Sequence, residues 1–368
     1  MTFPMTPPAP VTQHDGNTAR KVAVVTGASA GVGRATVRAF ARAGFDVALL
    51  ARGEAGLEGA AADVRAAGGR ALVLPTDVSS FEQVDAAASR AEAELGPIDV
   101  WVNDAMTTVF APSWEVEPKD FRRAVEVTFL GQVWGTMAAL SRMKPRDRGS
   151  IVNVGSALAF IGIPLQSAYC ASKFACRGFF DSVRAELLHE GSHVRIAMVH
   201  LPAVNTPQFD WCQTTLDRHP QPVPPIYQPE VCARFILQTA LDGRRDKVIG
   251  SWNKLLVMAG QLFPGLGNQY ASIGAWGSQL TDQPIGPDRP DNLRSPADAD
   301  KDAGAHGIFG DKAGGFLDPS FLKSMPTTAA NFAKAMGRLS REKAESYAST
   351  ARVKRSVHPE QAAGASRP

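Results

Sequence analysis

A tyrosine and a lysine one helical turn apart are the residues of this chain with the clearest capacity for chemistry. Tyr169 and Lys173 stand four positions apart, and on a helix two side chains at this spacing share a face. An ammonium beside a phenol favours the phenolate and brings the phenol pKa down toward neutral pH, where the group can donate and accept protons. The pair therefore predicts acid–base chemistry. The alternative is an amphipathic helix face on which a lysine extends into solvent.

Two further features favour the catalytic interpretation of this pair. Ser156 ends the strand-like run Ser150–Gly155, thirteen positions before Tyr169. A glycine-rich turn also lies near the start of the chain. We therefore take proton transfer as the working hypothesis for Tyr169 and Lys173.

The glycine-rich turn stands between a strand-like run and a helical stretch. Lys21–Val25 is apolar and rich in valine, the turn Thr26–Gly33 follows it, and helix formers continue to Ala43. Glycines at 27, 31 and 33 let the backbone approach a pyrophosphate, and the helix start supplies N–H groups that bind anions. A glycine turn alone is often only a turn, but a strand before it and a helix after it predict a dinucleotide site.

The end of the second strand-like run bears on the choice of cofactor. An acidic residue at position 51 would bind the ribose hydroxyls of the adenosine, and Ala51 cannot do so. Arg52, helped by Arg34, can instead hold a 2′-phosphate, which predicts NADP and makes NAD the less favoured cofactor. The alternative is that Arg52 is an ordinary exposed arginine.

Strand-like and helical stretches alternate along most of the chain. The strand-like runs lie at 21–25, 46–50, 71–74, 98–102, 150–155, 194–199 and 247–250. This alternation predicts an α/β domain over residues 21–250, a doubly wound parallel sheet of about seven strands with helices on both faces. Ligands of such sheets bind at the carboxyl ends of the strands. Asp77 and Val78 follow the third run, where they suit contact with an adenine.

Composition excludes several classes of function. The 368 residues carry a formal net charge of +3 from balanced acids and bases, which argues against a nucleic-acid partner. The four cysteines lack disulfide or metal-ligand spacing, so we expect no metal and a reducing, cytoplasmic location. The sequence has no run of eighteen apolar residues, which is about the length needed to span a bilayer. Residues 1–20 lack the apolar core of a signal peptide and are expected to be a disordered leader.

The second half of the chain contains segments that the sheet does not explain. Residues 202–230 are rich in proline and carry Phe209, Trp211 and Tyr227. They predict a lid over an apolar substrate, with a loop anchored by its aromatic residues as the alternative.

Residues 251–350 form a predicted extension beyond the sheet. It has an apolar helix at 252–263, a segment rich in proline and glycine at 284–315 and a last helix at 328–348, followed by a disordered tail at 351–368. The apolar stretch 252–276 is expected to pack against another surface, because apolar side chains exposed to water are unfavourable. We favour the substrate mouth or the flank of the sheet domain itself over a membrane or a second subunit of a homo-oligomer.

The motifs together resemble those of the short-chain dehydrogenase/reductase family, in its single-domain Rossmann-fold form, over Lys21 to about Gly250. The matching residues are Thr26–Gly33, Asp77, Asn103–Ala105, Ser156, Tyr169 and Lys173.

The resemblance implies roles for these residues. Tyr169 exchanges a proton with the substrate oxygen, Ser156 hydrogen-bonds the same oxygen, and Lys173 holds the nicotinamide ribose and lowers the Tyr169 pKa. The implied cofactor-binding residues are Gly27, Ser29, Ala30, Gly31, Val32, Gly33, Arg34, Arg52, Asp77, Val78, Asn103, Ala105, Tyr169, Lys173, Pro202 and Thr206. The chain is thus expected to be an NADP-dependent oxidoreductase that interconverts an alcohol and a carbonyl on a hydrophobic small molecule.

Three positions depart from the family pattern. Thr128 stands where the family usually has an asparagine that anchors a water of the proton relay, so its hydroxyl or a backbone carbonyl must take that catalytic role. Met106 and Ala203 replace two usual glycines. These departures motivate an alternative, an NADP-binding sensor or interaction protein that is catalytically impaired. The presence of Ser156 and Tyr169 favours the enzyme, because a sensor needs no proton donor.

Overall fold

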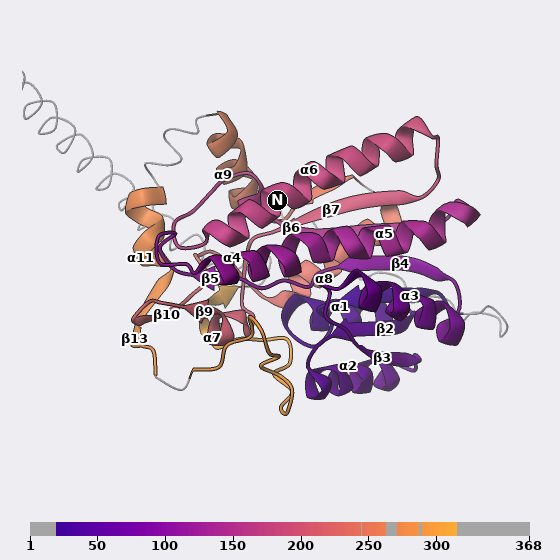
Figure 1. Cartoon of the computed structure of the whole chain (residues 1–368), viewed down its shortest axis with the longest axis horizontal. Helices are drawn as coiled ribbons and strands as arrows, with labels where there is room; N and C mark the ends of the chain where they lie inside the picture. Colours follow the sequence, from indigo (N-terminus) through magenta and orange to yellow (C-terminus); the bar gives the residue numbers. More distant parts are fainter. Residues whose placement is uncertain (1–19, 244, 263–270, 287–288, 315–368) are drawn as a thin grey trace, which may run out of the picture.

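A seven-stranded parallel sheet forms the centre of the molecule. The structure is a computed structural model, which describes residues 20–243, 245–262, 271–286 and 289–314. The strand order is β12-β7-β6-β4-β1-β2-β3 (Figure 1). The strands are β1 (Val22–Thr26), β2 (Asp46–Ala51), β3 (Ala71–Pro75), β4 (Ile98–Asn103), β6 (Ser150–Ser156), β7 (Arg195–Leu201) and β12 (Asp246–Val248). The predicted doubly wound α/β fold is confirmed.

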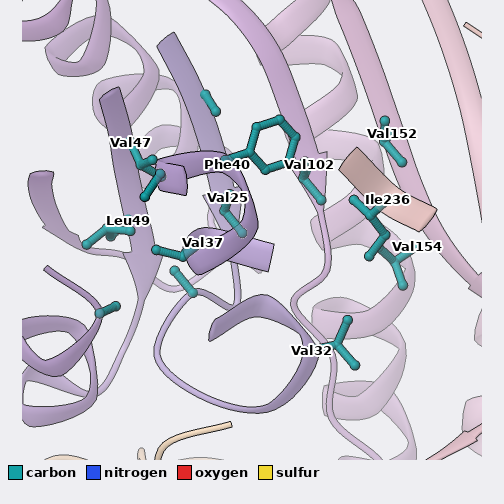
Figure 2. Packing of buried hydrophobic residues seen from close by; sticks show 14 of the residues in the cluster. Val25, Val32, Val37, Phe40, Val47, Leu49, Val102, Val152, Val154 and Ile236 are labelled. Atoms are coloured by element: carbon teal, nitrogen blue, oxygen red, sulfur yellow. The ribbon is translucent and has the colours of Figure 1, made fainter. Parts of the chain in front are cut away.

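Helices cover both faces of this sheet, because its strands are apolar on both sides. Successive strand residues face opposite ways, so Val25 packs into one core with Phe40, and Val24 packs into the other with Trp101. Figure 2 shows the first core, where Val25 lies between strands and helix beside Val37 and Phe40. The helices of this face are α1 (Gly31–Arg42), α2 (Glu54–Ala66) and α8 (Pro229–Asp242). Those of the other face are α3 (Phe81–Leu95), α5 (Gly131–Met143) and α6 (Ser167–His189).

The helical stretch that begins at Pro118 has an irregular middle. Pro118 stands at the start of α4 (Pro118–Val125), as expected of a residue without an N–H. A π-helical turn, η1 (Glu126–Leu130), then joins α4 to α5. Gly131 stands at the junction of η1 and α5. The start of α3 is capped, because the Ser80 hydroxyl accepts a hydrogen bond from the Gln83 N–H at 3.3 Å.

Short elements gather at the carboxyl edge of the sheet. β8 (Ala203–Val204), β11 (Ile226–Tyr227) and β14 (Ala313–Gly314) form a small parallel sheet, so the end of the described chain returns to the predicted lid. Two further pairs are β5 (Val109–Phe110) with β9 (Gln213–Thr214), and β10 (Arg218–Pro220) with β13 (Leu280–Pro284). The remaining elements are η2 (Lys144–Arg146), η3 (Ala157–Ala159), α7 (Gln208–Trp211), α9 (Ser251–Leu262), η4 (Ala271–Ala275), α11 (Trp276–Ser278) and η5 (Gly310–Lys312).

The extension after Gly250 is partly described. The predicted apolar helix corresponds to α9, one position earlier at each end. The predicted leader at 1–20, apart from Arg20, the helix at 328–348 and the tail at 351–368 lie outside the described residues.

Candidate active site

A cavity of about 1130 Å³ opens at the carboxyl edge of the sheet. Its walls include the glycine turn after β1 and the ends of β2, β4, β6 and β7. This is the edge at which parallel sheets bind ligands. The loop 202–227 and residues of α9 line the opposite side of the cavity.

Three of the four predicted catalytic side chains meet at this cavity. Ser156 ends β6, Tyr169 and Lys173 lie in the first two turns of α6, and all three line the cavity wall. The Lys173 ammonium lies 5.6 Å from the centre of the Tyr169 ring and donates a 2.8 Å hydrogen bond to the carbonyl of Val154. The Ser156 hydroxyl accepts a 3.1 Å hydrogen bond from the Leu158 N–H. The helical spacing read from the sequence therefore does bring the phenol and the ammonium together.

Burial changes the acid–base balance of this group. It raises the pKa of Tyr169 well above the usual range, and a side-chain hydrogen bond with Ser156 opposes the shift. Burial also lowers the pKa of Lys173, against the attraction of nearby Cys176 and Asp104. The shift of Tyr169 is the reverse of the predicted lowering, because desolvation of the phenolate outweighs the hydrogen bond with Ser156. Tyr169 is thus held as a protonated phenol.

The glycine turn has the close packing that a dinucleotide site requires. Gly27 and Gly31 have φ angles of +69° and +58°, where a side chain is strained. A methyl group added at Gly33 would overlap the carbonyl of Gly27, so this glycine lets α1 pack against the turn. Ser29, Ala30 and Val32 line the cavity with Gly27 and Gly31, whereas Gly33 does not.

Asp104 is a site residue that the sequence reasoning missed. It follows β4, lines the cavity, and its N–H donates to the Thr26 hydroxyl at 3.0 Å. Burial raises the pKa of its carboxyl to about 7, and the charge of Lys173 opposes this. The signal was present in the run Asn103–Ala105, where an ionisable side chain stands beside the predicted nucleotide turn. Ala105 and Met106 also line the cavity.

Two further predicted site residues, Asn103 and Thr128, do not line the cavity. The Asn103 amide donates to the side-chain oxygen of Asn153 at 2.8 Å and accepts from the indole of Trp101 at 2.7 Å, so it ties β4 to β6. The Thr128 hydroxyl donates to the carbonyl of Thr107 at 2.7 Å and accepts from the N–H of the same residue at 3.0 Å. The Thr128 hydroxyl, which a proton relay would need, is therefore already hydrogen-bonded as donor and as acceptor.

The predicted 2′-phosphate ligands also have protein partners. The Arg52 guanidinium lines the cavity and donates to the backbone carbonyls of residues 292, 293 and 294. Arg34 does not line the cavity, and its guanidinium pairs with Asp63 at 2.5 Å and with Asp302 at 2.9 Å. Both cations are therefore already neutralised or hydrogen-bonded by the fold.

Asp77 and Val78, the residues predicted to contact an adenine, both line the cavity just after β3. The Asp77 carboxylate accepts a 2.5 Å bond from Arg123 and bonds from Ser79, which hold its pKa below the usual range although burial opposes this.

The far side of the cavity is apolar. The predicted cofactor residues Pro202 and Thr206 lie on its rim, and all three aromatic residues of the predicted lid line it. Residues of the extension also line the cavity. The lining residues from the extension include Leu256, Gly260, Ala271 and Ala275. Other apolar lining residues are Phe160, Ile161, Phe174 and Val223.

Comparison with known proteins decides the family. A model of the short chain dehydrogenase family matches residues 21–215. The chain is a short-chain dehydrogenase. The family predicted from the motifs is confirmed. Its members are oxidoreductases that bind nicotinamide cofactors.

Relatives of this dehydrogenase share most of its length. The uncharacterized oxidoreductase YxnA of Bacillus subtilis (strain 168) is 34% identical over 269 residues, which cover 73% of this chain and 76% of the relative. The 3-dehydrosphinganine reductase of Danio rerio is 31% identical over 235 residues, or 62% and 70% of the two chains. A crystal structure of a short chain dehydrogenase/reductase from Burkholderia phymatum in complex with NAD has a TM-score of 0.62 at 22% identity and covers 68% of this chain and 95% of that one.

The described part of the dehydrogenase shows neither a bilayer span nor a metal cluster. None of its described helices is both long and apolar enough to cross a membrane. Within the same residues, no group of three or more histidine, cysteine, aspartate or glutamate side chains could hold a metal ion.

Proposed function

We propose that this short-chain dehydrogenase interconverts an alcohol and a carbonyl on an apolar small molecule. The observation that carries the proposal is that Ser156, Tyr169 and Lys173 line the same cavity as the glycine turn. A proton donor and a dinucleotide turn in one cavity fit a nicotinamide cofactor, since the turn offers backbone N–H groups to its pyrophosphate. When bound, that cofactor supplies or accepts the hydride.

The residues of the chain supply the proton transfer and the orientation. In the reductive direction Tyr169 donates a proton to the carbonyl oxygen, and in the oxidative direction it accepts one from the alcohol. Ser156 hydrogen-bonds the same oxygen and fixes its position. Lys173 orients the nicotinamide ribose. Burial raises the pKa of Tyr169, so the phenol keeps its proton, which is the state that the reductive direction requires.

An apolar substrate is supported by two independent observations. The far wall of the cavity carries Phe160, Phe174, Val223 and Leu256, and burying apolar surface there stabilises a hydrocarbon group. One relative is named for the reduction of 3-dehydrosphinganine, a compound with a long hydrocarbon chain. We propose a substrate with a comparable apolar part.

Four more specific expectations from the sequence remain predictions. They are NADP rather than NAD through Arg52 and Arg34, a water relay at Thr128, a cytoplasmic location and homo-oligomerisation. The partners of Arg34, Arg52 and Thr128 give the first two no support.

Turnover with a panel of alcohols and carbonyls tests the proposal. The purified protein is incubated with each compound and with NAD(H) or NADP(H), and the absorbance of the reduced nicotinamide is followed. We expect turnover of bulky apolar compounds and its loss in Tyr169→Phe. Cofactor binding without turnover of any compound would instead support a sensor or interaction protein.

A further inference from the structure

The segment 289–314, which we call the C-terminal strap, closes the adenosine end of the cavity. Its backbone carbonyls accept hydrogen bonds from the first turns of two helices. Gly304 accepts from Gly31 of α1 at 3.1 Å, and residues 298 and 299 accept from Gly56 and Ala55 of α2 at 3.3 and 3.1 Å. These N–H groups have no partner within their own helices. The strap is therefore part of the wall that a dinucleotide would meet.

One residue of the strap at this end of the cavity carries a buried carboxylate. Asp298 is among the lining residues and is only 6% exposed, and its Oδ2 atom has no hydrogen-bond partner among the described residues. A methyl group added at Gly53 or Gly56 would overlap this carboxylate, so it lies directly against the start of α2. The helix dipole favours a negative charge there. A buried carboxylate with an unused oxygen calls for a ligand that donates hydrogen bonds.

The ligand group that belongs at this position follows from the fold. The adenosine ribose of a dinucleotide lies at the end of the second strand, where an acidic residue binds its hydroxyls. Ala51 ends β2 and has no carboxylate, whereas Asp298 reaches the adjoining residues, Arg52 and Gly53, from the strap. Nearby Arg52 has its guanidinium committed to the strap carbonyls. Asp298 thus keeps an acceptor oxygen without a hydrogen bond in this corner, beside the charge of Arg52.

We propose that Asp298 is the residue that determines cofactor specificity, by accepting hydrogen bonds from the adenosine ribose hydroxyls and so favouring NAD over NADP. The 2′-phosphate of NADP replaces one of these donors with an anion, which the Asp298 carboxylate repels. The inference rests on the proposed function, because it requires a nicotinamide dinucleotide in the cavity. In this proposal Asp298 of the extension, and not Arg52, determines the choice between NAD and NADP.

Calorimetric titration of the full chain with NADH and NADPH tests this assignment. We expect wild type to bind NADH about ten- to a hundredfold more tightly than NADPH, the range of a charge-assisted hydrogen bond. Asp298→Asn should weaken NADH binding, strengthen NADPH binding and remove most of this preference. The matched control is Asp300→Asn, which removes the same charge from an exposed strap residue two positions away and should keep the preference.

The possible outcomes separate the two proposals. Tighter NADPH binding by wild type, or an unchanged preference in a folded Asp298→Asn variant, overturns the role of Asp298 and leaves the proposed function standing. Binding of neither cofactor overturns the proposed function itself. If Asp298→Asn does not fold, the wild-type ratio alone decides, because a carboxylate at this position and a preference for NADPH are incompatible.

Discussion

The guanidinium of Arg34 and the carboxylate of Asp302 form a two-pronged ion pair, with N–O distances of 2.9 and 3.2 Å. The two residues are 268 positions apart in the chain. The pair fastens the C-terminal strap to the first turn of α1. The Arg34 side chain is 4% exposed and pairs also with Asp63, whereas the Asp302 side chain is 38% exposed.

Removal of this pair should destabilise the fold modestly. We expect Asp302→Asn to lower the free energy of unfolding by about 1 kcal/mol, because Asp302 is partly in solvent and Asp63 still neutralises Arg34. Urea unfolding followed by circular dichroism measures the change. The control is Asp300→Asn, since Asp300 is exposed in the same strap. An equal effect of the two substitutions would show that the ion pair does not fasten the strap.

Tyr169→Phe should abolish turnover and spare cofactor binding. The ring remains and only the hydroxyl is lost, and general acid–base groups contribute about 10² to 10⁴ in rate. Steady-state kinetics and a parallel cofactor titration check both halves of this statement. Activity close to wild type in the Phe variant would rule out Tyr169 as the proton donor.

Asp104 should make both cofactor binding and stability depend on pH near neutrality. Burial raises the pKa of its carboxyl from 3.8 to about 7. The carboxyl is therefore neutral below pH 7 and charged above it, so the affinity for the anionic pyrophosphate of a dinucleotide should fall as the pH rises through about 7. Because the folded-state pKa is the higher one, its stabilising contribution is complete below about pH 4 and is lost as the pH rises through about 7.

Asp104→Asn provides the measurement for this dependence. The variant keeps the shape of the side chain and cannot ionise, so the affinity profile should become flatter between about pH 6 and pH 8 and the stability profile between about pH 4 and pH 7. Cofactor affinity and the midpoint of thermal unfolding are recorded across these ranges for wild type and variant. Superimposable profiles would assign the pH dependence to another group.

Arg52→Ala should weaken NADH and NADPH binding by similar factors. In the structure Arg52 holds the strap through the carbonyls of residues 292–294, so its loss loosens a wall that both cofactors share. Titrations with the two cofactors decide the matter. A loss confined to NADPH would restore the sequence-based interpretation of Arg52 as a ligand of the 2′-phosphate.

Leu256→Ala should raise the Michaelis constant for bulky apolar substrates more than for small ones. Leu256 lines the apolar wall of the cavity, and the loss of apolar contacts in such a pocket is worth about 1 to 3 kcal/mol per missing group. Leu255→Ala is the matched control, because the preceding leucine of α9 is 54% exposed and lies outside the lining. Equal effects on large and small substrates would place the substrate elsewhere.

Local patterns in the sequence determined the sheet and the centre of the site. The apolar runs that become β1 and β6 are buried throughout, and a continuous apolar strand of this kind has a stable place only between two layers of helices. The Tyr169–Lys173 spacing and the glycine turn act over one helical turn or one tight bend. Such features are predictable because their geometry depends on neighbouring residues alone.

Only the tertiary structure decided which side chains face the cavity and what lies across it. Asn103 and Thr128 stand at motif positions, yet buried partners on neighbouring elements turn both away from the site. The acceptors of Arg52 and the carboxylate of Asp298 come from more than 200 positions further along the chain. No periodicity in the sequence reports such contacts, because they depend on how the strap folds back over the edge of the sheet. Burial likewise reversed the expected pKa shift of Tyr169, since desolvation is a property of the packed structure and not of the residue spacing.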